Sequence, residues 1–294
     1  MSHTVILFYK FINLGEPDKL LISQCNLCQS LNLKGRIIIS SEGINGTLEG
    51  LNSDIERYIK DLCQIEEFRD VLFKKSLGSG NAFPRLSIKV RDEIVTTNLG
   101  YSNQLGPHRD YTGKYLSSQE LHSWYEEGKE FYMVDMRNDY EYQLGHFKDS
   151  IPLQDLKHFS DLPKILPEID HLRDKTIVTC CTGGIRCEKA SGFLMYNNFT
   201  DVYRLKDGIV TYMEKYPNSN FLGKLYVFDG RTAIGFNTDS PDHILVGKCT
   251  ICENQSENIV DYWLGDRRRH GIICEKCMQE GSVSFSKNIS KVLT

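Results

Sequence analysis

The chain has 294 residues, of which 40% are hydrophobic and 25% are charged. This is ordinary globular composition, so it excludes a disordered, collagen-like or coiled-coil chain, and the length predicts two or three domains. The net charge of −4 excludes a strong overall positive field, so a nucleic-acid partner would have to be held by local basic patches. No run approaches the roughly 20 apolar residues of a membrane span, and the first residues lack a secretory cleavage site. We therefore expect a cytoplasmic protein with no membrane partner.

Residues 1–97 alternate short strands and helices. Apolar and β-branched runs predict strands at residues 5–11, 36–39, 47–49, 71–77 and 85–95, and apolar spacing predicts helices at 16–31 and 55–63. We expect Gly43 and Gly46 to flank a turn, and residues 52–54 to cap the second helix. The order β-α-β-β-α-β predicts a ferredoxin-like α+β domain, with the possibility of RNA binding.

The rest of the chain divides into three parts. Residues 98–115 are rich in Gly and Asn without periodicity, which indicates a linker. A capping-box pattern at 117–120 and strands at 132–135 and 176–180 predict an α/β domain with a parallel sheet over residues 116–216. Residues 217–294 form a small third segment, with a strand at 225–229 and two cysteine pairs.

The first candidate site is a cysteine loop between a predicted strand and a predicted helix. Backbone N–H groups of such a loop surround one point and stabilise an anion there, so a cysteine at that point has a lowered pKa. Cys181 and Arg186 are the candidate catalytic residues, and the supporting loop consists of Thr182, Gly183, Gly184, Ile185 and Cys187. Cys180 is more simply interpreted as a buried apolar residue, although it also fits the Cys-x5-Arg spacing of phosphatases. Cys187 is equally compatible with a core position and a site position.

Motifs on both sides of this loop resemble those of a rhodanese domain. The opening signature comprises residues 135–137, 141–142, 145–147 and 151–152, and the closing one is residues 202–209. The extended loop 181–190 (CTGGIRCEKA), with 41–47 (SEGINGT), 138–141 (NDYE) and 227–229 (VFD), is similar to the bacterial rhodanese-domain family of oxygen-dependent tRNA uridine hydroxylases. The resemblance covers nearly the whole chain. It implies Cys181 as the catalytic cysteine, tRNA as the partner and 5-hydroxyuridine at the wobble position as the product. One departure is Asp207, where many rhodaneses have Gly; we expect little consequence.

The resemblance implies molecular oxygen as co-substrate, and the sequence shows no flavin or haem signature. A cofactor-free route begins with addition of the Cys181 thiolate to C6 of uracil, with loop N–H groups or Arg186 stabilising the developing oxyanion. Cys187 could protect an oxidised Cys181 as a disulfide. Two other interpretations remain open: a sulfurtransferase with a persulfide on Cys181, and a non-catalytic RNA-binding or sulfur-carrier module.

A second cysteine set predicts a structural zinc site in the third segment. The spacing gives two Cys-x2-Cys pairs 21 residues apart, and four thiolates suit tetrahedral zinc, with ligands Cys249, Cys252, Cys274 and Cys277. Four free thiols are the alternative. Cys25 and Cys28 fall on one face of the first predicted helix, which favours packing over metal binding.

Candidate RNA contacts are basic residues in two places. The first set lies on the last two strands of the N-terminal domain and comprises Lys74, Lys75, Arg85, Lys89 and Arg91; the second lies between the cysteine pairs and comprises Arg267, Arg268 and Arg269. A solvated surface is the alternative for each. Tyr101, Tyr111 and Tyr115 could stack on a flipped base or pack between domains.

Overall fold

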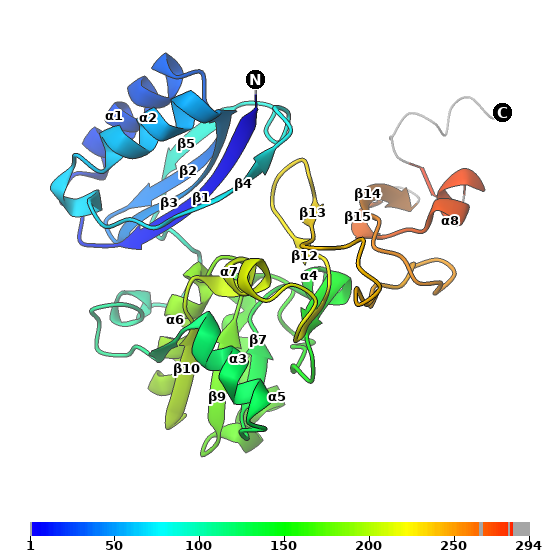
Figure 1. Cartoon of the computed structure of the whole chain (residues 1–294). Helices are drawn as coiled ribbons and strands as arrows, with labels where there is room; N and C mark the ends of the chain where they lie inside the picture. Colours follow the sequence, from blue (N-terminus) through cyan, green and yellow to red (C-terminus); the bar gives the residue numbers. More distant parts are fainter. Residues whose placement is uncertain (1, 265–266, 282, 285–294) are drawn as a thin grey trace.

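The computed structural model describes residues 2–264, 267–281 and 283–284. Its N-terminal part is a five-stranded sheet with two helices on one face (Figure 1). The strand order is β4-β1-β3-β2-β5, in which β5 runs parallel to β2 and the other neighbours are antiparallel. The elements are β1 His3–Phe11, α1 Pro17–Ser30, β2 Lys34–Ser40, β3 Gly43–Leu51, α2 Asn52–Leu62, the 3-10 helix η1 Glu66–Phe68, β4 Phe73–Gly78 and β5 Leu86–Val90. This order confirms the predicted ferredoxin-like arrangement, with β5 added at one edge.

Alternation along β1 decides what each face of this sheet contacts. Ile6 and Phe8 are fully buried beneath the helices, whereas Leu7 and Tyr9 point from the opposite face toward the central domain. The predicted turn at Gly46 is wrong, because Gly46 lies inside β3, where a Cβ atom would come 2.4 Å from the ring of Phe8. The predicted cap is wrong as well, because α2 begins at Asn52 itself.

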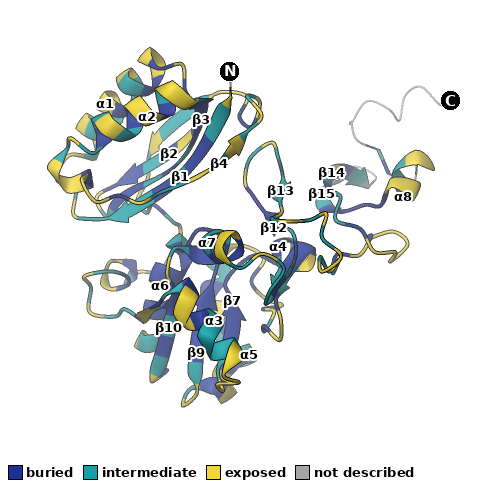
Figure 2. Ribbon diagram, viewed as in Figure 1, coloured by how far each residue is buried: buried dark blue, intermediate teal, exposed yellow. Residues whose placement is uncertain are grey.

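The central part is a four-stranded parallel sheet in the order β6-β10-β9-β7, with helices on both sides (Figure 1). Its strands are mostly buried, as expected for a parallel sheet covered on both faces (Figure 2). Residues 98–115 contain η2 Ser102–Gln104 and the start of β6. The other elements are β6 Lys114–Leu116, α3 Ser118–Glu126, β7 Tyr132–Asp135, α4 Asp139–Leu144, β8 Gly145–Phe147, η3 Phe159–Ile165, α5 Leu166–Ile169, η4 Asp170–Leu172, β9 Thr176–Cys180, α6 Ile185–Tyr196, β10 Asp201–Leu205 and α7 Gly208–Lys215.

The C-terminal part consists of short strands and one helix. β11 pairs with β8 of the central part, and β12 with β13 and β14 with β15 form hairpins. The bounds are β11 Phe221–Gly223, β12 Leu225–Tyr226, β13 Ala233–Ile234, β14 Ile259–Leu264, β15 Arg267–Ile272 and α8 Glu275–Gln279. The predicted strand at 225–229 is therefore shorter, and residues 227–232 form the loop of the β12–β13 hairpin next to the N-terminal sheet (Figure 1). None of the helices in these described ranges is long and apolar enough to cross a membrane.

A fully buried lysine connects the N-terminal and central parts. Lys189, on α6, places its ammonium 2.9 Å from Glu42 and 2.5 Å from Glu93, and it also donates to Ser102. Its side chain is 0% exposed. Separating a buried ion pair leaves an uncompensated charge and strongly destabilises the fold, so these contacts hold α6 against the turn between β2 and β3.

Candidate functional site

A cavity of about 340 Å³ lies where the three parts of the chain meet. One wall is the open face of the N-terminal sheet, which contributes Leu7, Tyr9 and Lys74, and the opposite wall is the loop after β9, with Cys181. The loop of the β12–β13 hairpin closes a third side with Phe228. The volume is in the range of small-molecule sites, which are typically concave and mostly apolar.

The cysteine loop is compact because two glycines allow close approach. Gly184 has a φ of +98° and precedes α6, and a Cβ on Gly208 would lie 2.6 Å from backbone atoms of Gly183 and Gly184. Side chains are strained at such positions, so glycine is required there. Asp207, in place of the usual glycine, adopts a φ of 65°, a left-handed conformation that Asp tolerates.

Cys181 is the loop cysteine that faces the cavity, and its pKa is low. Its sulfur accepts the backbone N–H of Gly184 at 3.2 Å. Burial by itself raises the pKa of Cys181, but a hydrogen bond from the Cys187 thiol, the charge of Arg186 and the loop N–H groups outweigh it and lower the pKa to about 6. Cys181 is therefore largely a thiolate at neutral pH.

The two neighbouring cysteines behave differently. Cys180 ends β9 within the hydrophobic core, and burial raises the pKa of its thiol well above the ordinary value. Burial also raises the pKa of Cys187, as does its hydrogen bond to Cys181, so Cys187 stays protonated and serves as a donor. Cys180 thus has the apolar position expected of it, and Cys187 is both a core residue and a neighbour of the reactive sulfur.

Arg186 forms a buried ion pair with the carboxylate of Glu141. Its two terminal nitrogens contact the oxygens of Glu141 at 2.7 and 2.8 Å, and both side chains are buried. The guanidinium fork that the sequence suggested for an oxyanion is therefore occupied, although its charge still acts on Cys181. Glu141 also accepts the hydroxyl of Thr182, so it holds the loop at two points. Sequence reasoning missed this function, although Glu141 stands in the quoted NDYE motif.

Lys74 and Tyr9 are among the polar groups that the N-terminal sheet contributes to the cavity. The Lys74 ammonium donates to the carbonyl of Gly183 at 2.9 Å and lies 5.1 Å from the ring centre of Tyr9. The Tyr9 hydroxyl donates to the buried carboxylate of Glu188 at 3.0 Å. Lys74 therefore faces the cysteine loop, and its binding to RNA stays a prediction. No signal in the sequence singled out Tyr9.

The other predicted RNA contacts lie outside the cavity or at its edge. Arg85, Lys89 and Arg91 are exposed, and alternation along edge strand β5 puts them on the open face of the sheet, beside Arg36 of β2. Lys75 pairs with Glu56 at 2.5 Å, on the helix side of the sheet.

Arg269 is exposed on β15. The backbones of Arg267 and Arg268 belong to the same strand, but their side chains lie outside the described part of the structure.

The linker tyrosines pack between elements. Tyr101 stacks on Tyr196 of α6 with ring centres 4.2 Å apart, and Tyr111 contacts the same ring edge-on. Tyr115 donates to Glu188 at 3.2 Å beneath the guanidinium of Arg204. These contacts favour the packing interpretation over base stacking.

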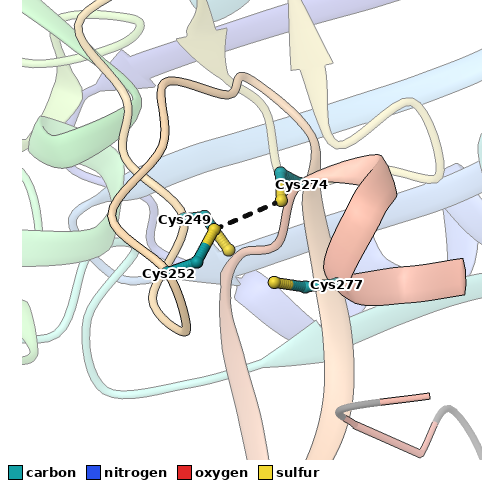
Figure 3. Close-up of side chains that lie close together, drawn as sticks. All are labelled: Cys249, Cys252, Cys274 and Cys277. Carbon is teal, nitrogen blue, oxygen red and sulfur yellow. Dashed lines mark hydrogen bonds between the residues drawn. The ribbon is translucent and has the colours of Figure 1, made fainter. Parts of the chain in front are cut away.

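The four cysteines of the third segment come together at one point (Figure 3). Their sulfur atoms all lie within 4.8 Å of one another, and those of Cys252 and Cys274 are 3.5 Å apart. Tetrahedral zinc with bonds of about 2.3 Å places its sulfurs roughly 3.8 Å apart, so the cluster fits zinc. Cys28, by contrast, lies in the N-terminal core, where burial raises the pKa of its thiol to about 12.

Comparison with known proteins matches each part of the chain to a family. Residues 3–94 match the UPF0176 acylphosphatase like domain, 117–215 the rhodanese-like domain and 222–288 the rhodanase C-terminal family. A Staphylococcus carnosus protein named tRNA uridine(34) hydroxylase is 37% identical over 95% of this chain and 90% of its own length. This chain belongs to the tRNA uridine(34) hydroxylase family. A relative of the same name from Aster yellows witches'-broom phytoplasma is 42% identical over 84% of this chain and 79% of its own.

Family membership confirms the resemblance found in the motifs. Among solved structures, a rhodanese-like domain from Anabaena matches 42% of this chain and 86% of its own, with a TM-score of 0.32 and 18% identity. This chain thus combines an acylphosphatase-like domain, a rhodanese-like domain and a C-terminal segment, whose β12–β13 hairpin reaches the cavity.

Proposed function

We propose that this protein hydroxylates the wobble uridine of tRNA to 5-hydroxyuridine with molecular oxygen, and that Cys181 is its nucleophile. The observation that supports the role of Cys181 is its position: a thiolate with a pKa of about 6 faces a cavity shared by all three parts of the chain. The curated relatives that match over most of the chain carry the name of this activity.

The first chemical step is addition of the Cys181 sulfur to C6 of the uracil. The S–C6 bond forms, and the electron pair of the C5–C6 double bond moves toward C5 and O4, which makes C5 nucleophilic. Oxygen then supplies the atom that C5 acquires, and elimination returns Cys181. Because the second oxygen atom leaves as water, the balance requires two electrons from an external reductant such as a thiol.

The wobble base reaches this thiolate by leaving the anticodon stack. Proteins recognise RNA sequence mainly in loops whose bases can be splayed out, and enzymes that modify a base take it into a pocket. The exposed cations Arg85, Lys89 and Arg91 on β5 are suited to holding the phosphates of the anticodon loop, with Arg269 on the second hairpin as a further contact.

The four clustered cysteines would hold a structural zinc ion. Such an ion would join the turn at residues 249–252 to the start of α8, in a segment that has only a small core of its own. Four thiolates fill a tetrahedral zinc ion completely, so the site would stabilise the fold without taking part in the reaction.

The test is nucleoside mass spectrometry on tRNA treated with the purified protein and a thiol reductant. In air the wobble uridine should gain the mass of one oxygen atom, and removal of oxygen should stop the reaction. Cys181→Ser should abolish it, whereas Cys180→Ser, the matched control in the core, should keep most of it. A strict need for thiosulfate, or a product that carries sulfur, would replace hydroxylation with the sulfurtransferase alternative.

A further inference from the structure

Most polar groups that line the cavity already have partners. Arg186 is paired with Glu141, and Arg36 donates to the carbonyl of Phe228 at 3.1 Å. Arg231 is held by Asp229, Ser76 and the carbonyl of Leu77. These side chains build the walls of the cavity, and the contacts hold their guanidinium groups in place.

Lys74 is different. In the part of the chain that the structure describes, its ammonium donates a single hydrogen bond, to the carbonyl of Gly183, and its other neighbour is the face of the Tyr9 ring. An ammonium has three donors, so two remain for a ligand in the cavity. Burial lowers the pKa of the Lys74 ammonium, and the negative charges of Asp207, Cys181 and Glu188 offset part of this effect.

The chemistry of the proposed reaction requires a donor opposite the sulfur. When sulfur adds to C6, the negative charge is shared between C5 and O4, and a preorganised cation at O4 stabilises this enolate. A donor without acceptor capacity also distinguishes the bases, because uracil presents an acceptor at this position and cytosine presents an amino donor. Arg186 is fixed within the loop by Glu141, whereas Lys74 faces that loop from the opposite wall of the cavity with two donors unused, which suits it to both tasks.

We propose, on the basis of the proposed function, that the Lys74 ammonium binds O4 of the target uracil, selects uracil over cytosine and stabilises the enolate formed by addition of Cys181. The step is balanced: one S–C6 bond forms, one π electron pair moves to C5 and O4, and nothing leaves. In heavy water without oxygen, C5 takes a deuteron from the solvent, and reversal releases the original proton and the thiolate.

Exchange of the C5 hydrogen therefore reports this step without oxygen or reductant. The experiment incubates the full-length protein anaerobically with unmodified tRNA in heavy water and measures deuterium at C5 of the wobble uridine. Lys74→Met should slow exchange by about 100-fold, which is typical for loss of one oxyanion donor, and tRNA affinity should change by less than about threefold. Lys74→Arg, which keeps charge and donors, should retain more of the rate.

The matched control is Lys60→Met, an exposed lysine of α2 on the helix side of the N-terminal sheet, away from the cavity; it should exchange like the wild type. Specificity is tested with tRNA that carries cytidine at the wobble position. Lys74→Gln, whose amide oxygen can accept from the cytosine amino group, should lower the uridine-to-cytidine exchange ratio by at least about tenfold.

Each remaining outcome has a distinct meaning. Suppose that the wild type hydroxylates tRNA in air. If Lys74→Met then exchanges the C5 hydrogen at the normal rate, or loses only affinity for tRNA, the proposed function stands and the role of Lys74 is overturned. Hydroxylation by the wild type without any exchange would overturn it too, because the enolate would not form. Wild-type protein that fails to hydroxylate tRNA would instead overturn the proposed function. Alkylation of Cys181 at neutral pH checks that each variant retains a folded loop.

Discussion

The hydrogen bond from Cys187 to Cys181 gives a quantitative prediction. This bond lowers the pKa of the Cys181 thiol more than the charge of Arg186 does. Cys187→Ala removes this donor. A hydrogen bond to a charged group contributes about 1.5–3 kcal/mol, and one pKa unit corresponds to about 1.4 kcal/mol. The substitution should therefore raise the pKa of Cys181 from about 6 to between roughly 7 and 8.

The assay is the rate of alkylation of Cys181 by iodoacetamide as a function of pH, with the modified peptide identified by mass spectrometry. Only the thiolate reacts, so the midpoint of the profile is the pKa. Cys187→Ser is the matched control, because its hydroxyl also donates and should keep the midpoint near 6. A midpoint that stays near 6 in Cys187→Ala would refute the reasoning and assign the shift to Arg186 and the loop N–H groups.

The lowered pKa of Cys181 also predicts how the stability of the fold depends on pH. The pKa of Cys181 in the folded state lies below that of an unfolded cysteine, about 8.5, so the thiolate stabilises the fold fully above that pH. This contribution is lost as the pH falls toward 6. In Cys187→Ala it should be smaller and disappear at higher pH, which urea unfolding at several pH values can measure.

Three further predictions concern the surroundings of the site. Glu141→Gln leaves Arg186 buried without a counter-charge and should lower the free energy of unfolding by about 3 kcal/mol in urea titrations; a loss below about 1 kcal/mol would mean that the pair contributes little. Metal analysis of reduced, folded protein should find one zinc ion per chain, and hydrogen exchange should show that chelation loosens residues 247–284 more than the central domain; a metal content near zero would contradict the zinc site. Arg85→Glu with Lys89→Glu should weaken tRNA binding and reduce its salt dependence by about one unit of slope per lost phosphate contact; unchanged binding and slope would move the contact to the hairpin that carries Arg269.

Local patterns predicted the local structure well. The apolar run at residues 5–11 predicted strand β1, and the Cys181 loop is contained in one short segment. Gly46 shows the limit of such reasoning. A glycine in a strand can mark a turn or a close contact, and only the approach of Phe8 from the neighbouring strand decides between them.

The composition of the cavity could not be predicted in the same way. It depends on contacts between residues far apart in the chain, such as Lys74 with Gly183 and Arg186 with Glu141. The sequence indicates a cation at each of these positions, but it does not show which one is neutralised. How the N-terminal sheet packs on the central domain sets the Lys74 contact, and the fold of the central domain sets the pairing of Arg186 with Glu141.

The buried lysine on α6 has a consequence for how the RNA must enter. Lys189 lies on the helix that follows the reactive loop and forms ion pairs with Glu42 and Glu93. Moving the N-terminal and central domains apart would therefore expose or separate buried charges. The width of the cleft is thus set when the chain folds, before any RNA arrives. Under the proposed function, the entropic cost of assembling the reactive geometry then falls on the anticodon loop, which extrudes one nucleotide into a preformed cleft. Flexible anticodon loops should be the better substrates, and the enzyme itself should change little in shape on binding.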